Sequence, residues 1–245
     1  MASITLDSVS VSFPIYSAGS RSLKNMMISA TTGGRIATES KHVIIQALDN
    51  VSLTFNHGDK VGLVGHNGAG KTTLLRVMAG IYEPYQGSVA VEGKITPMFD
   101  IGLGVDVEST GYENITLRGL YMGLSKAQIA ERMESVVAFT ELGEFLRFPV
   151  RTYSAGMQAR LTFAIATSVS PDILLLDEGI GAGDADFMAK ANNRLEAFVK
   201  EAGVLVLASH SQELMRRFCN KAVIMEHGRA IWFGDIDEAF KIYKG

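Results

Sequence analysis

The chain has 245 residues, of which 47% are hydrophobic and 20% charged, so it can bury a large core. Its 23 basic and 26 acidic residues give a net charge of −3, which argues against a dedicated nucleic-acid binder, because such domains are usually basic. The single cysteine, Cys219, excludes an internal disulfide and a cysteine-built zinc site. No apolar run reaches the roughly 18 residues that span a bilayer, and the N-terminus lacks a signal-peptide core, so we expect a cytosolic protein.

Alternating apolar and polar side chains predict strands near the N-terminus. Residues 4–13 predict one bent strand or two short ones. Val43–Ala47 and Val51–Phe55 predict two more strands, separated by a turn at Asp49-Asn50. Residues 17–41 are rich in Ser, Gly and Thr, and we expect an insertion there that contains one short helix.

A glycine-rich turn joins the next two predicted elements. Lys60–Val64 is a short apolar run typical of a strand, and Lys71–Met78 has the spacing of a helix. Ser88–Val91 and Lys94–Phe99 predict two further strands. The pattern then becomes helical, and we expect a helical subdomain at about residues 105–170.

Two helix starts in this subdomain carry a specific signal. Thr110 with Glu113, and Ser125 with Gln128, have the spacing of capping boxes, in which each side chain bonds to the backbone N–H of the other residue. Ser154–Val169 predicts a third helical stretch.

Beyond residue 170, short apolar runs alternate with helical patterns. The predicted elements are strands at Ile173–Leu176, Val204–Ala208, Lys221–Glu226 and Ala230–Phe233, and helices within Phe187–Lys200, Gln212–Phe218 and Ile236–Tyr243. We expect His227-Gly228 to form a hairpin turn. Alternation of this kind predicts a parallel sheet covered by helices.

One loop has the composition of a phosphate-binding loop. The pattern G-x-x-x-x-G-K-[ST] is matched in full by Gly65, His66, Asn67, Gly68, Ala69, Gly70, Lys71 and Thr72. Glycines let the backbone N–H groups point at phosphate oxygens, and the following helix N-terminus adds partial positive charge. Lys71 can reach the β- and γ-phosphates, and the Thr72 hydroxyl can bind Mg²⁺. We count Thr73 with these nucleotide-binding residues.

Two carboxylates follow a fully apolar predicted strand. Ile173–Leu176 leads into Asp177 and Glu178, and a run without polar residues is typical of a central parallel strand. Ligands bind at the carboxyl ends of such strands. Asp177 is therefore placed to hold Mg²⁺ through water, and Glu178 to polarise an attacking water. The alternative, two solvated or helix-capping carboxylates, is disfavoured by the complete phosphate loop.

A third motif completes a characteristic order. Tyr153-Ser154-Ala155-Gly156-Met157 precedes the acidic strand, and Ser209-His210 follows the strand after it. The order of phosphate loop, Ser-Ala-Gly helix start, acidic strand and histidine resembles the nucleotide-binding domain of ATP-binding-cassette (ABC) transporters, over essentially the whole chain.

This resemblance implies an α/β fold. It would have a P-loop NTPase core with a mostly parallel sheet, an N-terminal antiparallel β-subdomain and an inserted helical subdomain. Residues 1–245 would form a single ABC ATPase domain without a C-terminal carbohydrate-binding domain. The resemblance further implies an ATPase that uses ATP and Mg²⁺, acts as a homodimer with two copies of a transmembrane permease, and lies at the cytoplasmic face of the bacterial inner membrane.

Further site residues carry over by position. The family signature, which binds the γ-phosphate held by the opposite subunit, is matched by Ser154, Ala155, Gly156 and Met157. Asp184 matches the loop that connects the two sites across the dimer, and His210 matches the histidine that contacts the γ-phosphate. Phe13 matches the aromatic residue that stacks on adenine, with Tyr16 as a competitor.

Departures from the usual family pattern narrow the resemblance. Asp100 stands where most members carry a glutamine that senses Mg²⁺, and an acidic group can still bind this ion. Together with Val11–Tyr16, Thr110–Asn114 and the Tyr-Ser-Ala-Gly-Met signature, this position resembles bacterial exporters of cell-surface polysaccharides such as O-antigens, capsules and teichoic acids.

The resemblance therefore implies the ATPase subunit of an exporter of lipid-linked polysaccharide. Two alternatives stay open: an ABC ATPase for another exported substrate, such as a lipid or drug, and a soluble ABC ATPase acting on ribosomes or DNA. The soluble alternative is disfavoured, because ribosome-acting members usually carry two cassettes and DNA-repair members carry a long coiled coil, whereas this chain has one cassette and no sustained heptads. We expect no nucleic-acid partner.

Overall fold

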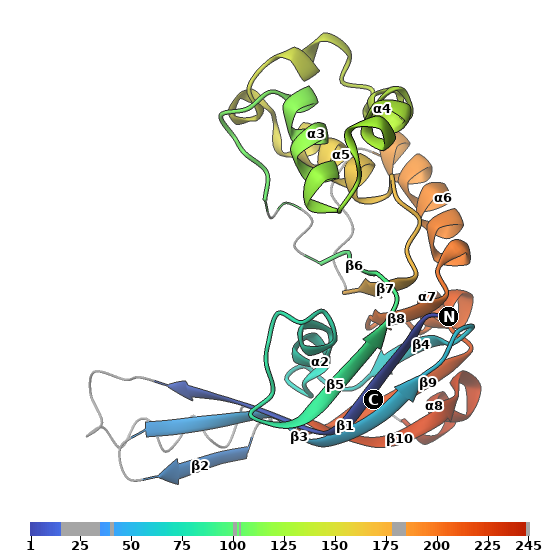
Figure 1. Ribbon diagram of the computed structural model, residues 1–245. Coiled ribbons are helices and arrows are strands. Elements are labelled where there is room, and N and C mark those ends of the chain that lie inside the picture. Colours follow the sequence, from blue (N-terminus) through green and yellow to red (C-terminus); the bar gives the residue numbers. More distant parts are fainter. Residues whose placement is uncertain (16–34, 40–41, 100–101, 103, 178–184, 244–245) are drawn as a thin grey trace. The chain divides into compact units, whose positions relative to one another are not determined.

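The computed structural model describes residues 1–15, 35–39, 42–99, 102, 104–177 and 185–243 (Figure 1). The chain divides into two compact units. The first contains both sheets and is drawn from Met1–Pro97, Asp172–Glu178 and Gly203–Gly245. The second is helical and combines Met98–Pro171 with Gly179–Ala202.

The smaller sheet is antiparallel and has the strand order β2-β3-β1-β5. Its strands are β1 (Ser3–Ile15), β2 (Arg35–Glu39), β3 (His42–Phe55) and β5 (Gln86–Glu92). The prediction of two strands on either side of Asp49-Asn50 was wrong, because β3 runs continuously through this point. Asn50 adopts a φ of 53°, which asparagine tolerates, and the shift is absorbed as a bulge in the pairing with β1.

The sequence does not predict strand β2, because this strand lies inside the polar segment that predicts an insertion. The short helix expected there rests on Leu23, Met26 and Met27, which lie outside the described part of the chain. The alternative of one bent strand at the N-terminus is confirmed: β1 is a single strand with irregular register between Leu6 and Ser12.

The larger sheet has the order β10-β9-β4-β8-β7-β6. Its strands are β4 (Lys60–Val64), β6 (Ile95–Pro97), β7 (Ile173–Leu176), β8 (Val204–Ala208), β9 (Lys221–Glu226) and β10 (Arg229–Asp235). Neighbouring strands are parallel except for the β9–β10 hairpin, which confirms the predicted mostly parallel sheet. Every residue of β7 and β8 is buried, as their unbroken apolar sequences require.

Seven α-helices are described in these residues, and each unit has its own set (Figure 1). The first unit contains α2 (Lys71–Met78), α7 (Gln212–Phe218) and α8 (Ile236–Ile242). The second contains α3 (Gly111–Tyr121), α4 (Lys126–Thr140), α5 (Ala155–Ala166) and α6 (Ala185–Glu201), with short 3₁₀ turns at Gly143–Arg147 and Val150–Thr152. Among the described helices, none combines the length and apolar character needed to cross a membrane.

The helical unit has its own core and the predicted helix starts. Its centre includes the fully buried Leu146 and Leu161. Both predicted capping boxes are confirmed, at the N-termini of α3 and α4. These caps satisfy backbone N–H groups that a helix end otherwise leaves without partners. The expected limits of the helical subdomain and the single-domain organisation stay predictions.

Candidate functional site

The glycine-rich loop joins β4 to α2 in the first unit. Gly70, directly before α2, has a φ of 104°, and a Cβ there would lie 2.8 Å from the carbonyl oxygen of Ala47. No side chain caps α2 and its first turn contains no acidic residue, whereas Ser154 caps α5 and Ser125 caps α4. The start of α2 therefore presents backbone N–H groups and the positive end of the helix dipole, which is the arrangement that binds a phosphate.

Lys71 reaches back into this loop. Its side chain is buried, and Nζ donates hydrogen bonds to the carbonyl oxygens of Gly65 (2.5 Å) and His66 (3.1 Å). The ammonium group is thus fixed within the loop, beside the start of α2. A buried cation beside helical N–H groups fits the negatively charged oxygens of a nucleotide's terminal phosphates.

Thr72 and Asp177 come together at the edge of this loop. The Thr72 hydroxyl donates a 2.9 Å hydrogen bond to Oδ2 of Asp177, which directly follows β7. A hydroxyl and a carboxylate are the hard oxygen ligands that Mg²⁺ prefers, and this ion usually takes only one or two protein ligands besides phosphates and water. The described residues contain no group of three or more His, Cys, Asp and Glu side chains that could hold a metal ion by themselves. The pair fits a magnesium ion that arrives with a nucleotide.

The β9–β10 turn supports the phosphate loop. The sequence did not reveal this contact. The backbone N–H of Gly228 donates to the Ala69 carbonyl (3.0 Å), and the Asp49 N–H donates to the Gly228 carbonyl (2.9 Å). The rings of His227 and His66 lie 5.2 Å apart. The predicted hairpin turn is confirmed, but its contact with the loop joins residues about 160 positions apart and has no local sequence signal.

We expect Gly228→Ala to destabilise the protein and weaken nucleotide binding. Gly228 has a φ of 80°, and an added Cβ would lie 2.7 Å from the Ala47 carbonyl oxygen. The matched control is Gly58→Ala, at a φ of 93° with no atom within 4 Å of the added Cβ. Chemical unfolding should show a loss about 1–3 kcal/mol larger for Gly228→Ala. Equal losses for the two variants would contradict the supporting role of the turn.

Phe13 lies at the far end of β1 and packs against another aromatic residue. Its ring meets the Tyr82 ring edge-on, with centroids 5.1 Å apart, and the Tyr82 hydroxyl accepts a 3.2 Å hydrogen bond from Arg76 of α2. Phe13 is therefore held by neighbours that the sequence did not single out. Its competitor Tyr16 lies outside the described residues.

Ser154 begins α5 in the helical unit. Its hydroxyl accepts a 3.2 Å hydrogen bond from the Met157 N–H, so Ser154 caps the helix as its sequence suggests. Ser154 is exposed, and with Gly156 and Met157 it lines a pocket of about 290 Å³. Glu141 and Arg160 line the same pocket and were not predicted from the sequence.

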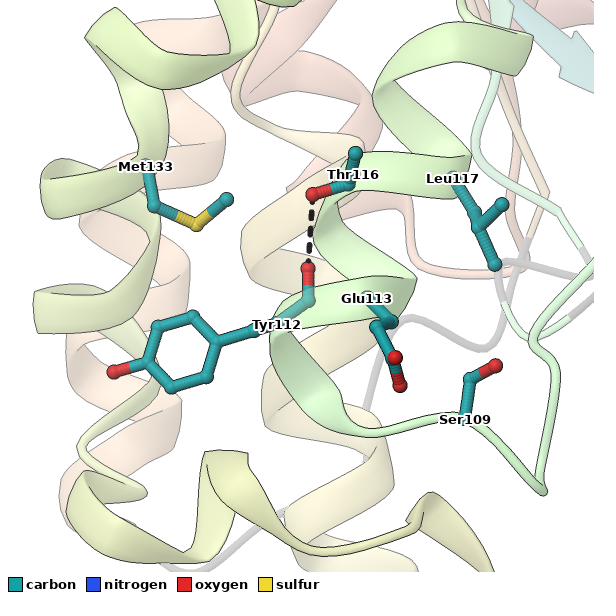
Figure 2. A pocket seen from close by; sticks show the side chains of 6 residues that line it. All are labelled: Ser109, Tyr112, Glu113, Thr116, Leu117 and Met133. Carbon is teal, nitrogen blue, oxygen red and sulfur yellow. Dashed lines mark hydrogen bonds between the residues drawn. The ribbon is translucent and has the colours of Figure 1, made fainter.

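A second pocket lies on the same unit, between residues of α3 and α4 (Figure 2). It has a volume of about 410 Å³ and is lined by Ser109, Tyr112, Glu113, Thr116, Leu117 and Met133. The Glu113 carboxylate is held at one side by the N–H (2.7 Å) and hydroxyl (2.8 Å) of Thr110. These bonds hold the pKa of Glu113 below its usual value, so an apolar hollow carries a fixed negative charge.

The remaining predicted site residues are divided between described and undescribed parts. His210 is exposed and directly follows the buried Ser209, after β8. Asp100, Glu178 and Asp184 lie outside the described residues, and their roles stay predictions.

Comparison with known proteins identifies the family. The ABC transporter family model matches residues 48–181. The O-antigen export system ATP-binding protein RfbE of Yersinia enterocolitica is 47% identical over 229 residues, 93% of this chain and 96% of that protein. The corresponding RfbB of Klebsiella pneumoniae is 34% identical over 241 residues, 98% and 97% of the two chains.

Solved structures show the same fold. A dimeric ATP-binding cassette in a post-hydrolysis state with ADP and Pi aligns with a TM-score of 0.67 at 21% identity, over 95% of this chain and 98% of that one. The mixed-sheet architecture with its antiparallel sheet and helices is that of ABC ATPase domains. The family match, the long alignments and the fold agree, and this chain belongs to the ABC transporter family.

Proposed function

We propose that this chain is the ATP-binding and hydrolysing subunit of a bacterial ABC exporter that moves lipid-linked, O-antigen-like polysaccharide across the inner membrane. The observation that carries the proposal is the 47% identity to an O-antigen export ATP-binding protein over 93% of this chain. An alignment of that length includes the nucleotide core and the helical unit alike, so the likeness extends beyond the ATPase motifs that all ABC proteins have in common.

The phosphate loop would bind the β- and γ-phosphates of ATP. The N–H groups at the start of α2 and the buried Lys71 ammonium supply positive charge at one place. Thr72 and Asp177 would hold Mg²⁺, with Asp100 as a further ligand, and the bound ion would neutralise charge on the phosphates. Thr73 and the other loop residues would complete the cradle.

Hydrolysis would depend on residues at the ends of β7 and β8. Glu178, next to Asp177 in the chain, would accept a proton from the attacking water or orient it. His210, exposed after β8, would donate a hydrogen bond to the γ-phosphate. Phe13, or Tyr16 in its place, would stack on adenine, and the Tyr82 contact supports Phe13 in that role.

Two copies of the chain would enclose two ATP molecules. The signature residues Ser154–Met157 of one copy would meet the γ-phosphate held by the other, and Asp184 would link the two sites. The exposed hydroxyl of Ser154 and the N-terminus of α5 suit an anion. The closed dimer would act on two copies of a permease from the cytoplasmic face of the membrane.

Removal of the gene tests this function. In the source strain, its loss should leave polysaccharide inside the cell and remove it from the surface, since synthesis does not need the exporter. The intact gene should restore surface polysaccharide, and a copy encoding Lys71→Ala should not. Normal surface polysaccharide in the deletion strain would contradict the proposal.

The α3–α4 pocket is the proposed docking site for the permease. Its apolar side chains Tyr112, Leu117 and Met133 suit the apolar face of a helix, and Glu113 suits a basic residue beside it (Figure 2). We expect Leu117→Asp to reduce export about tenfold while the isolated chain still hydrolyses ATP. The docked permease would bury the charge of the new aspartate, and burying an unpaired charge opposes docking.

The matched control is Leu120→Asp, since Leu120 is 42% exposed on the same helix and does not line the pocket. Export is measured in membranes that contain the complete exporter, and ATP turnover is measured with the isolated chain. Equal export by the Leu117→Asp and Leu120→Asp exporters would contradict docking in this pocket.

A further inference from the structure

Glu141 occupies an unusual position in the helical unit. It directly follows α4 and has a φ of 55°, a left-handed conformation that glycine usually supplies at a helix end. A glutamate in this conformation is strained, and such strain is kept where the side chain has a specific task. The side chain therefore needs an explanation beyond helix termination.

The Glu141 carboxylate bridges two cations on two other helices. Oε2 accepts a 3.2 Å hydrogen bond from Arg160 of α5, and Oε1 is ion-paired with Lys190 of α6. The bond from Lys190, with support from Arg160, holds the pKa of Glu141 below its ordinary value. One carboxylate thus joins the end of α4 to α5 and α6.

Arg160 is also held from a second side. Its guanidinium lies 4.8 Å from the centroid of the Phe187 ring, which is only 2% exposed and comes from the first turn of α6. Ser154 caps the N-terminus of α5, Arg160 lies less than two turns further along the same helix, and both line the pocket of about 290 Å³ with Glu141. The ion cluster thus acts on the part of α5 that carries the signature.

The cluster is poorly suited to be mainly a stability device. In the pair of Glu141 with Lys190 the side chains are 41% and 56% exposed, and exposed ion pairs contribute little to folding; Arg160, at 18% exposed, is the shielded member of the cluster. Apolar packing already joins the same helices, because Phe139 of α4, Phe163 of α5 and Phe187 of α6 pack as a cluster of rings. What the charges add is direction, since Glu141 ties Arg160, in the middle of α5, to Lys190 of α6.

We infer that Glu141 is a positioning residue: through Arg160 and Lys190 it aims the Ser154 turn at the phosphate bound by a second copy of the chain. This inference rests on the proposed function, in which Ser154 acts on the opposite copy. It predicts that loss of Glu141 impairs ATP-driven pairing of two chains and leaves the binding of ATP to a single chain unchanged, because the phosphate loop lies in the other unit.

The test uses the full-length chain with Glu178→Gln, so that bound ATP persists. Glu141→Gln is compared with Glu144→Gln. Glu144 lies three residues after Glu141 and forms an exposed ion pair with Arg147, so this control removes the same charge from a different pair. Dimer formation is measured by analytical ultracentrifugation over a range of ATP concentrations, and binding to a single chain by titration with a fluorescent ATP analogue. We expect Glu141→Gln to weaken association about tenfold and Glu144→Gln to leave it unchanged.

A second variant addresses the case in which Glu141→Gln folds poorly. Lys190→Met removes only the ion pair between Glu141 and α6 and keeps the bond between Glu141 and Arg160. This variant should also weaken association. A parent chain that associates with ATP while Glu141→Gln and Lys190→Met associate equally well overturns the inference alone. A parent chain that neither binds ATP nor associates overturns the proposed function, and this inference with it.

Discussion

Replacing Lys71 with alanine is expected to lower ATP turnover by about 10²-fold or more, because it removes a buried cation from the charged phosphates in the transition state. The Lys71 ammonium is fixed by the carbonyl oxygens of Gly65 and His66 and does not have to be ordered when ATP binds. A donor held in advance stabilises developing charge more than a mobile one. Binding should weaken as well, since the same cation meets the ground-state phosphates.

The control for this variant is Lys126→Ala. Lys126 is an exposed lysine that begins α4, as Lys71 begins α2, but it belongs to the helical unit. Turnover is measured by phosphate release with the purified chain in its exporter complex. Turnover of Lys71→Ala within about twofold of the parent would exclude Lys71 from the site, because catalytic donors contribute far more than that.

Replacing Glu178 with glutamine is expected to abolish most turnover while ATP still binds. The amide keeps the size of the side chain but cannot accept a proton from water, and a catalytic base contributes about 10²-fold or more. Chain order puts Glu178 next to Asp177, whose carboxylate meets Thr72 at the phosphate loop. ATP should therefore accumulate on the protein unhydrolysed.

Asp172→Asn is the matched control. Asp172 directly precedes β7, the buried strand that Asp177 and Glu178 follow, and its carboxylate accepts a 2.8 Å hydrogen bond from the Lys94 N–H. An asparagine oxygen can accept the same bond, so turnover should change little. Single-turnover hydrolysis measures the chemical step and a nucleotide-binding assay measures ATP binding, so the two measurements show whether a variant has lost hydrolysis or binding. Rapid hydrolysis by Glu178→Gln would show that another group activates the water.

Local signals allowed much of the fold to be predicted. The capping boxes at Thr110 and Ser125 are present as expected, because a cap depends on residues three positions apart. Strand β7 and helix α2 also follow from local apolar patterns. Strand β3 was wrongly divided, because Asn50 has the sequence signature of a turn, whereas pairing with β1 carries the strand through it as a bulge.

Long-range contacts account for what the sequence could not predict at the candidate site. The Gly228 bond to Ala69, the Tyr82 contact with Phe13 and the Glu141 bridge between α5 and α6 join residues far apart in the chain. No periodicity or spacing encodes such contacts. The phosphate loop was predictable because the pattern Gly65–Thr72 is itself a continuous segment between a strand and a helix.

The most direct test of the proposed exporter is transport in a purified system. The chain and its permease are reconstituted in vesicles that carry the lipid-linked polysaccharide, and the sugar is probed with a glycosidase on the side away from the ATPase. We expect ATP to move polysaccharide to that side, and the Glu178→Gln exporter to move little or none. Steady ATP hydrolysis without any movement of the polysaccharide would contradict the account.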